Sequence, residues 1–314
     1  MEVRKRYFQV SEELLELLDP AMPSIDARLE AVAAALPELA VAAAAKAIAE
    51  WGRPASDITH LVVSTSSGAQ MPGVDVRVAS LLGLSPTVRR TMIYFQACAG
   101  GAGALRVAKD AAENNRGAGA RVLVVCADVL SVMAFHAPDD DEARRRPEGI
   151  VAHALFGGRG GRRTLLGPRG APRLRDGTTI PGTERFVTGD FSAAGVGYNL
   201  APLEVPELVG DNIERCLATA LDPLGLPSGA GAGGWNSLFW VVHPGSSTIM
   251  NSYEKALRLE PGKLAASRRA GPTVIFVLDE VVRRRRQCEW GVLVGLGPGF
   301  TAEVIALRSL ATPL

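Results

Sequence analysis

The sequence predicts an α/β fold made of two related halves. Apolar runs rich in β-branched residues alternate with amphipathic helical patterns, and this alternation is typical of parallel sheets covered by helices. Each half contains a strand-to-helix junction that carries one candidate catalytic residue. The composition, 47% apolar and 21% charged, is that of an ordinary globular protein with a large core.

The first half opens with an Ala-rich helical pattern over residues 24–51. We expect Pro37 to divide this pattern into two helices, because proline interrupts helix hydrogen bonding. Residues 59–65 form a continuous apolar and β-branched run, which predicts a central strand. A short amphipathic helix is predicted over residues 74–84, followed by a second strand over residues 90–97.

A helix follows over residues 105–115, with apolar residues on one face, and a buried strand over residues 120–126 comes after it. Strand, helix and strand in this order predict a βαβ unit with parallel strands and a right-handed crossover.

The second half repeats the alternation after a poorly patterned stretch, residues 138–206, in which no clear core strand is predicted. We divide the chain into an N-terminal half, residues 1–157, and a C-terminal half, residues 158–314. The predicted elements of the second half are helices over residues 206–221 and 247–259 and strands over residues 237–244, 273–280, 289–299 and 301–310.

Charge and cysteine usage exclude several classes of protein. Thirty-four basic and thirty-three acidic residues leave a net charge of +1, so no overall field attracts nucleic acid or an anionic membrane. No apolar run reaches membrane-spanning length, which favours a soluble intracellular protein. The four cysteines lack CxxC spacing, which argues against a disulfide framework or a structural zinc site.

Cys98 stands where the predicted strand 90–97 ends and a glycine-rich helix start follows. Unpaired backbone N–H groups and the dipole of a helix start favour a thiolate, so we expect this position to lower the pKa of the Cys98 thiol. Gly100, Gly101 and Gly103 carry no side chains and would let a long substrate approach the sulfur.

His243 also stands at a predicted strand end and is the natural partner of Cys98. Its imidazole could accept the thiol proton and donate a hydrogen bond to a developing oxyanion. Two structural alternatives remain open, since a lone cysteine is usually a small buried hydrophobe and a histidine before Pro-Gly can be an ordinary loop residue. The remaining cysteines and histidines are interpreted as structural: Cys126, Cys216, Cys288, His60, His136 and His153.

Five segments follow one another along the chain: ITHLVVSTSSGAQMPGVDVRVASLLGL, YFQACAGGAGALRVAKDAAENNRGAGARVLVVCAD, FWVVHPGSSTIM, LEPGKLAASRR and WGVLVGLGPGF. Together they resemble the chalcone synthase superfamily of plant type III polyketide synthases. The resemblance extends from about Val3 to Leu310, and the segments GDNIERCL and EPGKLAASRR are especially similar to the grass curcuminoid synthase branch. It implies a thiolase-like α/β fold with mixed central sheets layered by helices as αβαβα, incomplete relative to the family.

The resemblance also implies roles for individual residues. Cys98 aligns with the family nucleophile, and His243 aligns with the histidine that activates it and polarises the malonyl thioester carbonyl. Phe156 and Tyr198 fall at the two aromatic gatekeeper positions, and Met71 matches the methionine that reaches across the dimer. Other positions expected to bind substrate are Ser66, Met133, Gly189 and Val196 in the initiation and cyclisation pocket, and Gly297, Pro298 and Gly299 in a GFGPG-like loop.

The sequence departs from the family pattern in three places. Residues 269–272 span the gap where relatives carry a third catalytic residue, an asparagine. Arg162 and Arg163 fall where an apolar central strand is expected, so we expect that strand to shift outward or fray, because an unpaired buried arginine is costly. Family chains also begin several dozen residues earlier, which indicates truncation at the N-terminus.

Two functions follow from these observations. The first is an acyltransferase that condenses malonyl-CoA onto an aromatic, phenylpropanoid acyl-CoA through a Cys98 thioester, in flavonoid or phenylpropanoid polyketide biosynthesis. The second is a catalytically impaired homologue that acts only as a dimer partner or vestigial product. A ketoacyl synthase of the bacterial type is disfavoured, because such an enzyme lacks the MPGVD and GLGPG motifs that this chain carries. A nucleic-acid binder that uses residues 283–286 is disfavoured by the net charge of +1.

For either function we expect coenzyme A thioesters as substrates with no cofactor and no metal. We also expect a homodimer in the cytoplasm, with no nucleic-acid or membrane partner.

Overall fold

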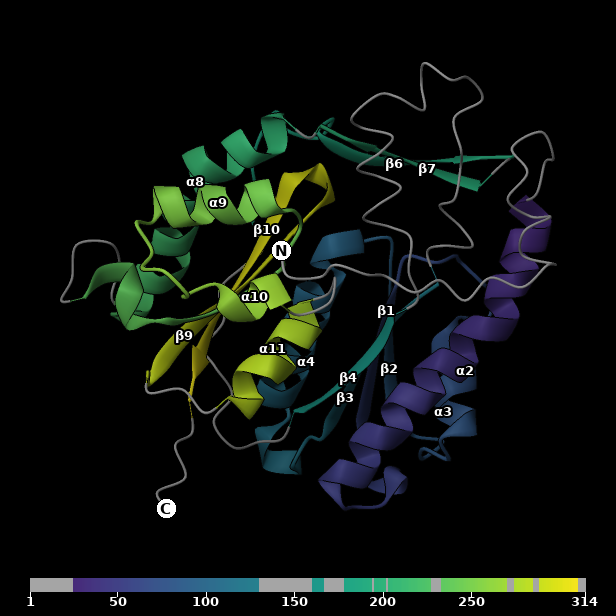
Figure 1. Ribbon diagram of the computed structural model, residues 1–314. Coiled ribbons are helices and arrows are strands. Elements are labelled where there is room, and N and C mark those ends of the chain that lie inside the picture. Colours follow the sequence, from purple (N-terminus) through teal and green to yellow (C-terminus); the bar gives the residue numbers. More distant parts are fainter. Residues whose placement is uncertain are drawn as a thin grey trace.

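The computed structural model describes residues 25–129, 160–166, 178–193, 195–201, 203–226, 233–269, 274–284 and 288–309 (Figure 1). Two four-stranded sheets and one two-stranded sheet are connected by helices. The helices are α2 (Ile25–Trp51), α3 (Val74–Leu81), α4 (Gly100–Asn114), α8 (Glu204–Leu221), α9 (Ser247–Ala256), α10 (Ala265–Arg269) and α11 (Val274–Arg283). Short 3-10 helices are η1 (Ala55–Asp57), η2 (Ala97–Ala99), η3 (Arg116–Ala118), η4 (Asp222–Leu224), η5 (Gly234–Ser237) and η6 (Pro298–Phe300).

The first sheet has the order β2-β1-β3-β4. Strand β1 runs parallel to β2 and β3, which confirms the predicted parallel unit, and β4 pairs antiparallel to β3. Because successive side chains of a strand point to opposite faces, β1 directs Leu61 and Val63 toward α2 and α3, and Val62 toward α4. The strands are β1 (His60–Thr65), β2 (Arg89–Tyr94), β3 (Val122–Asp128) and β4 (Gly160–Leu166).

The second sheet has the order β5-β10-β9-β8, and a separate hairpin pairs β6 with β7. One face of the second sheet packs on α4 and α11, and the other packs on α8 and α9. The described elements therefore form five layers, with α4 and α11 between the two sheets (Figure 1). The strands are β5 (Thr178–Thr179), β6 (Val187–Ser192), β7 (Gly195–Leu200), β8 (Phe239–Val242), β9 (Trp290–Gly297) and β10 (Thr301–Arg308).

Pro37 does not divide the first helix, so the expected break is wrong. Helix α2 continues from Ile25 to Trp51 with Pro37 buried inside it. Proline cannot donate the hydrogen bond that the Ala33 carbonyl would otherwise accept, and the Arg77 guanidinium of α3 donates to that carbonyl instead, at 3.3 Å. A tertiary contact thus replaces part of what the proline removes.

The strand predicted over residues 273–280 is also wrong, because this segment lies in helix α11. The buried side chains Val274, Ile275, Val277 and Val281 follow helical spacing and pack in the layer between the sheets. A short apolar run that is buried on several sides has a similar sequence pattern in a helix and in a strand. The spacing of its apolar residues alone therefore led to the wrong assignment.

The middle of the chain contains more regular structure than its pattern predicts. Strand β4 pairs with β3 over all seven residues, 160–166, and therefore does not fray. Among the described strands it lies at the edge of the first sheet and not at its centre, which agrees with the expected outward position. The first sheet consequently extends past the expected boundary after residue 157. The stretch without predicted core strands contains β4, β5, β6 and β7.

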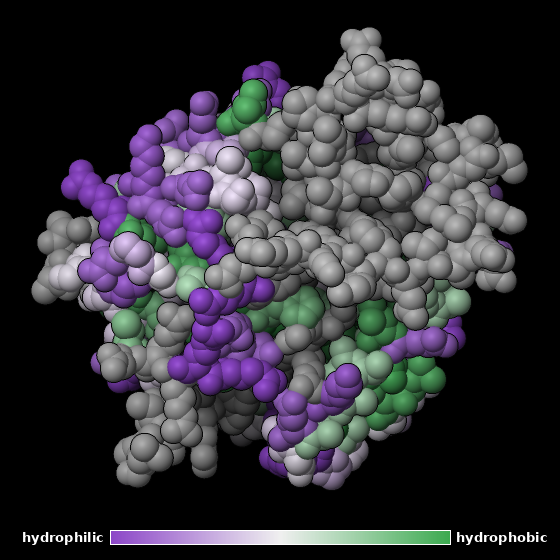
Figure 2. Space-filling view, viewed as in Figure 1, coloured by the Kyte–Doolittle hydropathy of each residue, from purple (hydrophilic) through white to green (hydrophobic). Residues whose placement is uncertain are grey.

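Helix α2 is long and apolar enough to cross a membrane by length and composition alone. However, it buries Val32, Leu36, Ala40 and Ala44 against the first sheet and α3. Figure 2 shows hydrophobic and hydrophilic residues side by side on the surface around it. This is the pattern of a helix that covers a core, so α2 gives little support for a membrane span.

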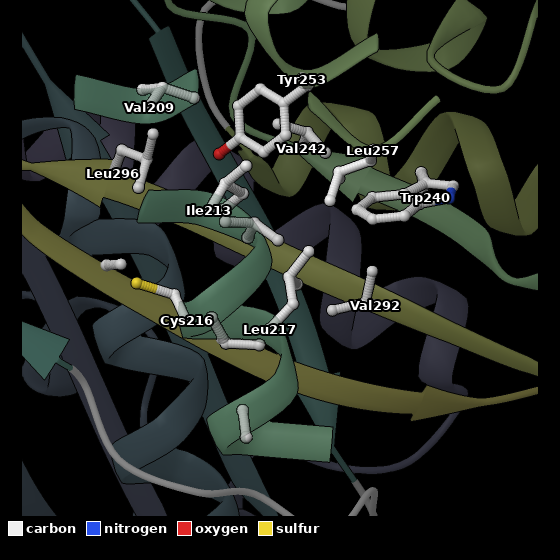
Figure 3. Close-up of a cluster of buried hydrophobic side chains, with 14 of the residues drawn as sticks. Val209, Ile213, Cys216, Leu217, Trp240, Val242, Tyr253, Leu257, Val292 and Leu296 are labelled. Carbon is white, nitrogen blue, oxygen red and sulfur yellow. The ribbon is translucent and has the colours of Figure 1, made fainter. Parts of the chain in front are cut away.

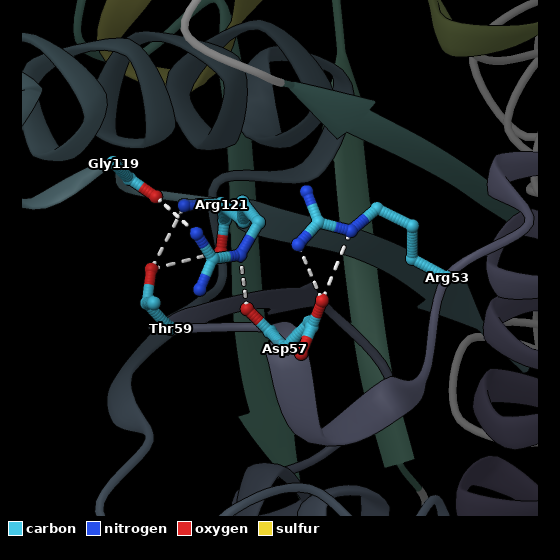
Figure 4. A network of polar contacts seen from close by, with 5 residues as sticks. All are labelled: Arg53, Asp57, Thr59, Gly119 and Arg121. Atoms are coloured by element: carbon cyan, nitrogen blue, oxygen red, sulfur yellow. Dashed lines mark hydrogen bonds and ion pairs between the residues drawn. The ribbon is translucent and has the colours of Figure 1, made fainter.

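A polar network ties together the amino ends of β1 and β3 (Figure 4). The Thr59 hydroxyl donates to the Arg121 carbonyl at 3.1 Å and accepts from the Arg121 N–H at 2.8 Å. The Arg121 guanidinium donates to the carbonyls of Asp57 and Gly119. The Asp57 carboxylate pairs separately with exposed Arg53. This network lies at the end of the sheet opposite to the carboxyl ends of the strands.

The core beneath α8 and α9 holds one polar atom without a partner (Figure 3). The hydroxyl of Tyr253 is fully buried and has no hydrogen-bond partner among the described residues. Burial, and secondarily Cys216, raises the pKa of Tyr253 well above its usual value, so this hydroxyl stays protonated.

We expect the substitution Tyr253→Phe to stabilise the protein by about 1 kcal/mol, because it removes a buried hydroxyl that loses its hydration without gaining a bond. Urea denaturation measures the change. The matched control is Tyr94→Phe, since the Tyr94 hydroxyl donates to the Gln70 carbonyl at 3.4 Å. The control should lose stability or leave it unchanged, and a loss of more than about 1 kcal/mol in Tyr253→Phe would contradict the assignment.

Candidate active site

Cys98 lies in a sharp turn between β2 and α4. The turn is the short helix η2, and two of the three residues before Cys98 have left-handed backbone conformations, Phe95 at φ 58° and Ala97 at φ 43°. Non-glycine residues rarely adopt such angles, so surrounding contacts must hold them. Cys98 itself is half-buried with a free thiol. The chain therefore presents this residue at the junction that the sequence predicted.

Three neighbours hold the turn. The Ala97 N–H donates to the hydroxyl of Ser66 at 2.9 Å, and Ser66 lies just beyond the end of β1. On the other side, Gly297 of β9 lies so close that a Cβ there would stand 2.6 Å from the Cβ of Ala99. Gly295 approaches Ala102 of α4 in the same way. Ser66 and Gly297, both predicted from the sequence, therefore border the Cys98 turn.

His243 follows the last residue of β8, and its N–H donates to the Val294 carbonyl of β9 at 2.8 Å. The same strand carries Gly297 against the Cys98 turn, so β9 brings the two candidate catalytic residues to one end of the second sheet. The His243 side chain is buried, and its Nδ1 atom has no hydrogen-bond partner among the described residues. No hydrogen bond joins the ring to Sγ of Cys98 among the contacts of the described residues.

The expectation of a lowered thiol pKa at Cys98 is wrong. Burial raises the pKa of Cys98 to about 11, and the nearby Asp128 carboxylate raises it further, while a backbone hydrogen bond lowers it only in part. The sequence argument considered the helix start alone. Neither the burial of the turn nor the charge on β3 could be read from the local pattern.

Burial lowers the pKa of His243 to about 4. Near neutral pH the pair in this structure is therefore a neutral thiol and a neutral imidazole. A neutral imidazole can accept a proton, so the pair is suited to general-base activation during attack on a carbonyl, with no thiolate formed beforehand.

This protonation state predicts how Cys98 responds to alkylation. A group with a raised pKa gains its anion only as the pH rises toward that pKa, so iodoacetamide labelling of Cys98 should increase steadily toward about pH 11. Peptide mass spectrometry over a pH series measures this. Labelling that reaches its plateau below about pH 7 would contradict the prediction and restore the activated thiolate.

The other predicted residues divide into three groups. Pro298 and Gly299 lie in η6, which contacts η2, so they accompany Gly297 near Cys98. Gly189 and Tyr198 face each other across the β6–β7 hairpin, with Gly189 exposed, and Val196 of that hairpin is buried against the core under α2. Met133 and Phe156 lie outside the described residues.

The hairpin approaches the Cys98 turn through an aromatic contact. The ring of Phe191 on β6 meets the ring of Phe95 edge-on, with centroids 5.1 Å apart. Both side chains keep substantial exposure, 56% and 40%. The hairpin that carries the predicted pocket residues therefore contacts the segment that leads into the Cys98 turn.

The place of the missing asparagine lies between α10 and α11, where residues 270–273 are outside the described residues. Directly after this gap, Val274 and Ile275 of α11 pack on Gly101, with a Cβ there 3.0 Å from Val274 Cγ1. Apolar side chains therefore border the start of α4. Asn251, on α9, gives no support to this region because its side-chain oxygen accepts from Arg268.

Sequence reasoning missed one residue of the site, Asp128. It ends β3, and its Oδ1 atom accepts from the Ser66 N–H at 2.6 Å. The available signal was an aspartate directly after a buried apolar strand, at the edge of the sheet where the carboxyl ends of parallel strands meet. Among the described residues, no group of three metal-ligating side chains lies together.

Comparison with known proteins gives consistent matches over most of the chain. Residues 1–168 match the family model for the N-terminal domain of chalcone and stilbene synthases, and residues 174–311 match the model for their C-terminal domain. The chain is 47% identical over 336 aligned residues to bisdemethoxycurcumin synthase of Oryza sativa subsp. japonica, an alignment that covers 98% of this chain and 81% of that protein.

Proposed function

Because the chain belongs to the chalcone and stilbene synthase family, we propose that it condenses malonyl-CoA onto an aromatic acyl-CoA starter through a thioester on Cys98. Enzymes of this type III polyketide synthase family act on coenzyme A thioesters without a further cofactor. The similarity to a curcuminoid synthase favours phenylpropanoid starters, as in flavonoid and related biosynthesis. We place the protein in the cytoplasm on the same grounds.

The observation that carries this proposal is the Cys98 turn. The thiol-bearing residue stands at a strand-to-helix junction, directly after Ala97 with its left-handed backbone, and is bordered by Ser66 and by the Gly297 loop. In the proposed reaction, His243 accepts the thiol proton as Sγ attacks the starter thioester, and coenzyme A leaves as its thiol. Malonyl-CoA then loses carbon dioxide, and the resulting carbanion attacks the Cys98 thioester and frees the sulfur.

The test incubates the purified protein with p-coumaroyl-CoA and malonyl-CoA labelled at the free carboxyl. We expect release of labelled carbon dioxide and a polyketide product that carries the starter. If a folded, correctly assembled protein releases no carbon dioxide and forms no product, the proposal is refuted.

Three observations favour a second candidate, an impaired homologue. The pKa values of Cys98 and His243 disfavour a preformed ion pair, and Nδ1 of His243 is buried without a partner among the described residues. Removing one donor to a developing oxyanion costs about 10²–10³ in turnover, which is the expected effect of the absent asparagine. Labelled carbon dioxide without a condensation product would mean that the chemistry of Cys98 and His243 persists while elongation fails, as expected of an impaired enzyme.

We also propose that the protein is a homodimer whose contact includes Met71. This side chain is fully exposed, at 100%, although methionine is usually buried. The substitution Met71→Glu should convert the dimer to a monomer in sedimentation experiments, because a charge would be buried at the contact. The control Leu203→Glu changes another exposed apolar residue, at 78%, on the second half. A wild-type protein that sediments as a monomer contradicts the proposal.

A further inference from the structure

Asp128 collects hydrogen bonds from the end of the neighbouring strand. Its Oδ1 atom accepts from the Ser66 N–H at 2.6 Å, from the Thr65 hydroxyl at 3.3 Å and from the Ser67 hydroxyl at 3.5 Å. The Ser67 hydroxyl in turn accepts from the Val129 N–H at 2.5 Å. The carboxylate therefore ties the carboxyl ends of β1 and β3 together.

This cluster reaches the nucleophile in one further step. The hydroxyl of Ser66 accepts from the Ala97 N–H at 2.9 Å, and Ala97 directly precedes Cys98. Ala97 adopts φ 43°, a conformation that a non-glycine residue keeps only when its surroundings fix it. A continuous path of hydrogen bonds and covalent bonds thus leads from Asp128 through Ser66 to the turn.

Asp128 also lies on the face of the sheet that carries this turn. Cys126, two residues earlier on β3, packs in the layer that contains α4. Alternation along a strand places Asp128 on that same face. In keeping with this placement, the Asp128 carboxylate raises the pKa of both Cys98 and Cys126, although burial is the larger cause for each.

We propose that Asp128 is a positioning residue for Cys98: through Ser66 it holds the turn that presents the thiol, and it places a negative charge beside that thiol. The inference rests on the proposed role of Cys98 as nucleophile. A neutral amide could accept the same hydrogen bonds, so the geometric and the electrostatic parts of this role can be separated by substitution.

The groups around Asp128 are few. They are the uncharged Thr65, Ser66 and Ser67 of the β1 end, Cys98 of η2 and Cys126 of β3. Among the described residues, Asp128 is the one charged side chain that shifts the pKa of Cys98. Burial also raises the pKa of Asp128, although its hydrogen bonds lower it in part.

The first experiment measures iodoacetamide alkylation of Cys98 against pH in Asp128→Asn. This change keeps the Oδ1 acceptor and removes the charge. We expect the apparent pKa of Cys98 to fall by about one unit, which gives about tenfold faster alkylation near pH 9. The matched control is Asp57→Asn, the same chemical change at the opposite end of the sheet, where the carboxylate pairs with exposed Arg53 (Figure 4).

The second experiment uses Ser66→Ala, which keeps the charge and removes the contact to Ala97. We expect kcat to fall about ten- to a hundredfold with KM unchanged, because a displaced nucleophile loses near-attack geometry, and the alkylation pKa to stay at its wild-type value. Asp128→Ala should show both effects. Asp128→Asn should retain more of kcat than Asp128→Ala, since it preserves the acceptor.

The inference is overturned if Asp128→Asn has the same alkylation profile as Asp57→Asn, or if Ser66→Ala turns over at the wild-type rate. Should the wild-type protein release neither carbon dioxide nor product, the proposed function fails, and the alkylation profiles alone decide the inference. Asp128→Asn preserves shape, so it serves even where Ser66→Ala does not fold.

Discussion

The substitution Cys98→Ala should reduce product formation at least about a thousandfold, because removal of a covalent nucleophile eliminates the acyl intermediate. Incubation with the starter thioester alone, followed by mass spectrometry of the intact protein, should show acylation in the wild type and none in the variant. The side chain changes little in size, so the fold should remain.

Cys288→Ala is the matched control for this experiment. Cys288 is likewise a half-buried free cysteine, but it lies just before β9 begins, whereas the Cys98 turn packs on the residue that ends β9. The control should retain wild-type acylation and turnover. Retention of acylation in Cys98→Ala would mean that another residue carries the acyl group, and the assignment of the site would fail.

The substitution Gly297→Ala should reduce turnover about a hundredfold and lower stability by about 1–3 kcal/mol. A Cβ at this position would stand 2.8 Å from the backbone N of Ala99 and 3.1 Å from the backbone O of Gln96. Backbone atoms on both sides of Cys98 cannot rotate away, so the turn must move from β9. Turnover assays and thermal unfolding measure the two effects.

Gly210→Ala is the control for added volume. Gly210 lies in helix α8, and a Cβ added there would have no atom within 4 Å outside the helix's own backbone and the neighbouring residues. Because alanine favours the helix over glycine, this variant should gain about 0.5–1 kcal/mol with unchanged turnover. If Gly297→Ala behaves like Gly210→Ala, then β9 does not fix the Cys98 turn.

Local patterns in the sequence predicted most of the regular structure. The strand over residues 59–65 is β1, and the helix over residues 206–221 is α8, each with shifts of a residue or two at its ends. Each of these elements buries one or both of its faces, and the spacing of its apolar residues matches that burial. The effect of Pro37 on its helix was predicted wrongly because it depends on the Arg77 guanidinium of another helix. The segment of α11 was assigned to a strand because its packing in the layer between the sheets involves other elements.

The resemblance to chalcone synthases, which several segments of the chain carry, is confirmed by the family models and by the curcuminoid synthase relative. Ser66 and Gly297 border the Cys98 turn, whereas Met133 and Phe156 lie outside the described residues.

By itself the sequence determined that Cys98 and His243 follow strand ends, since strand and helix periodicities are local properties of the chain. Only the tertiary structure decided what surrounds them. The close approach of Gly297, the hydrogen bond from Ala97 to Ser66 and the charge of Asp128 join segments far apart in the chain. The pKa of the thiol follows from those surroundings, because burial and neighbouring charge depend on distances in space.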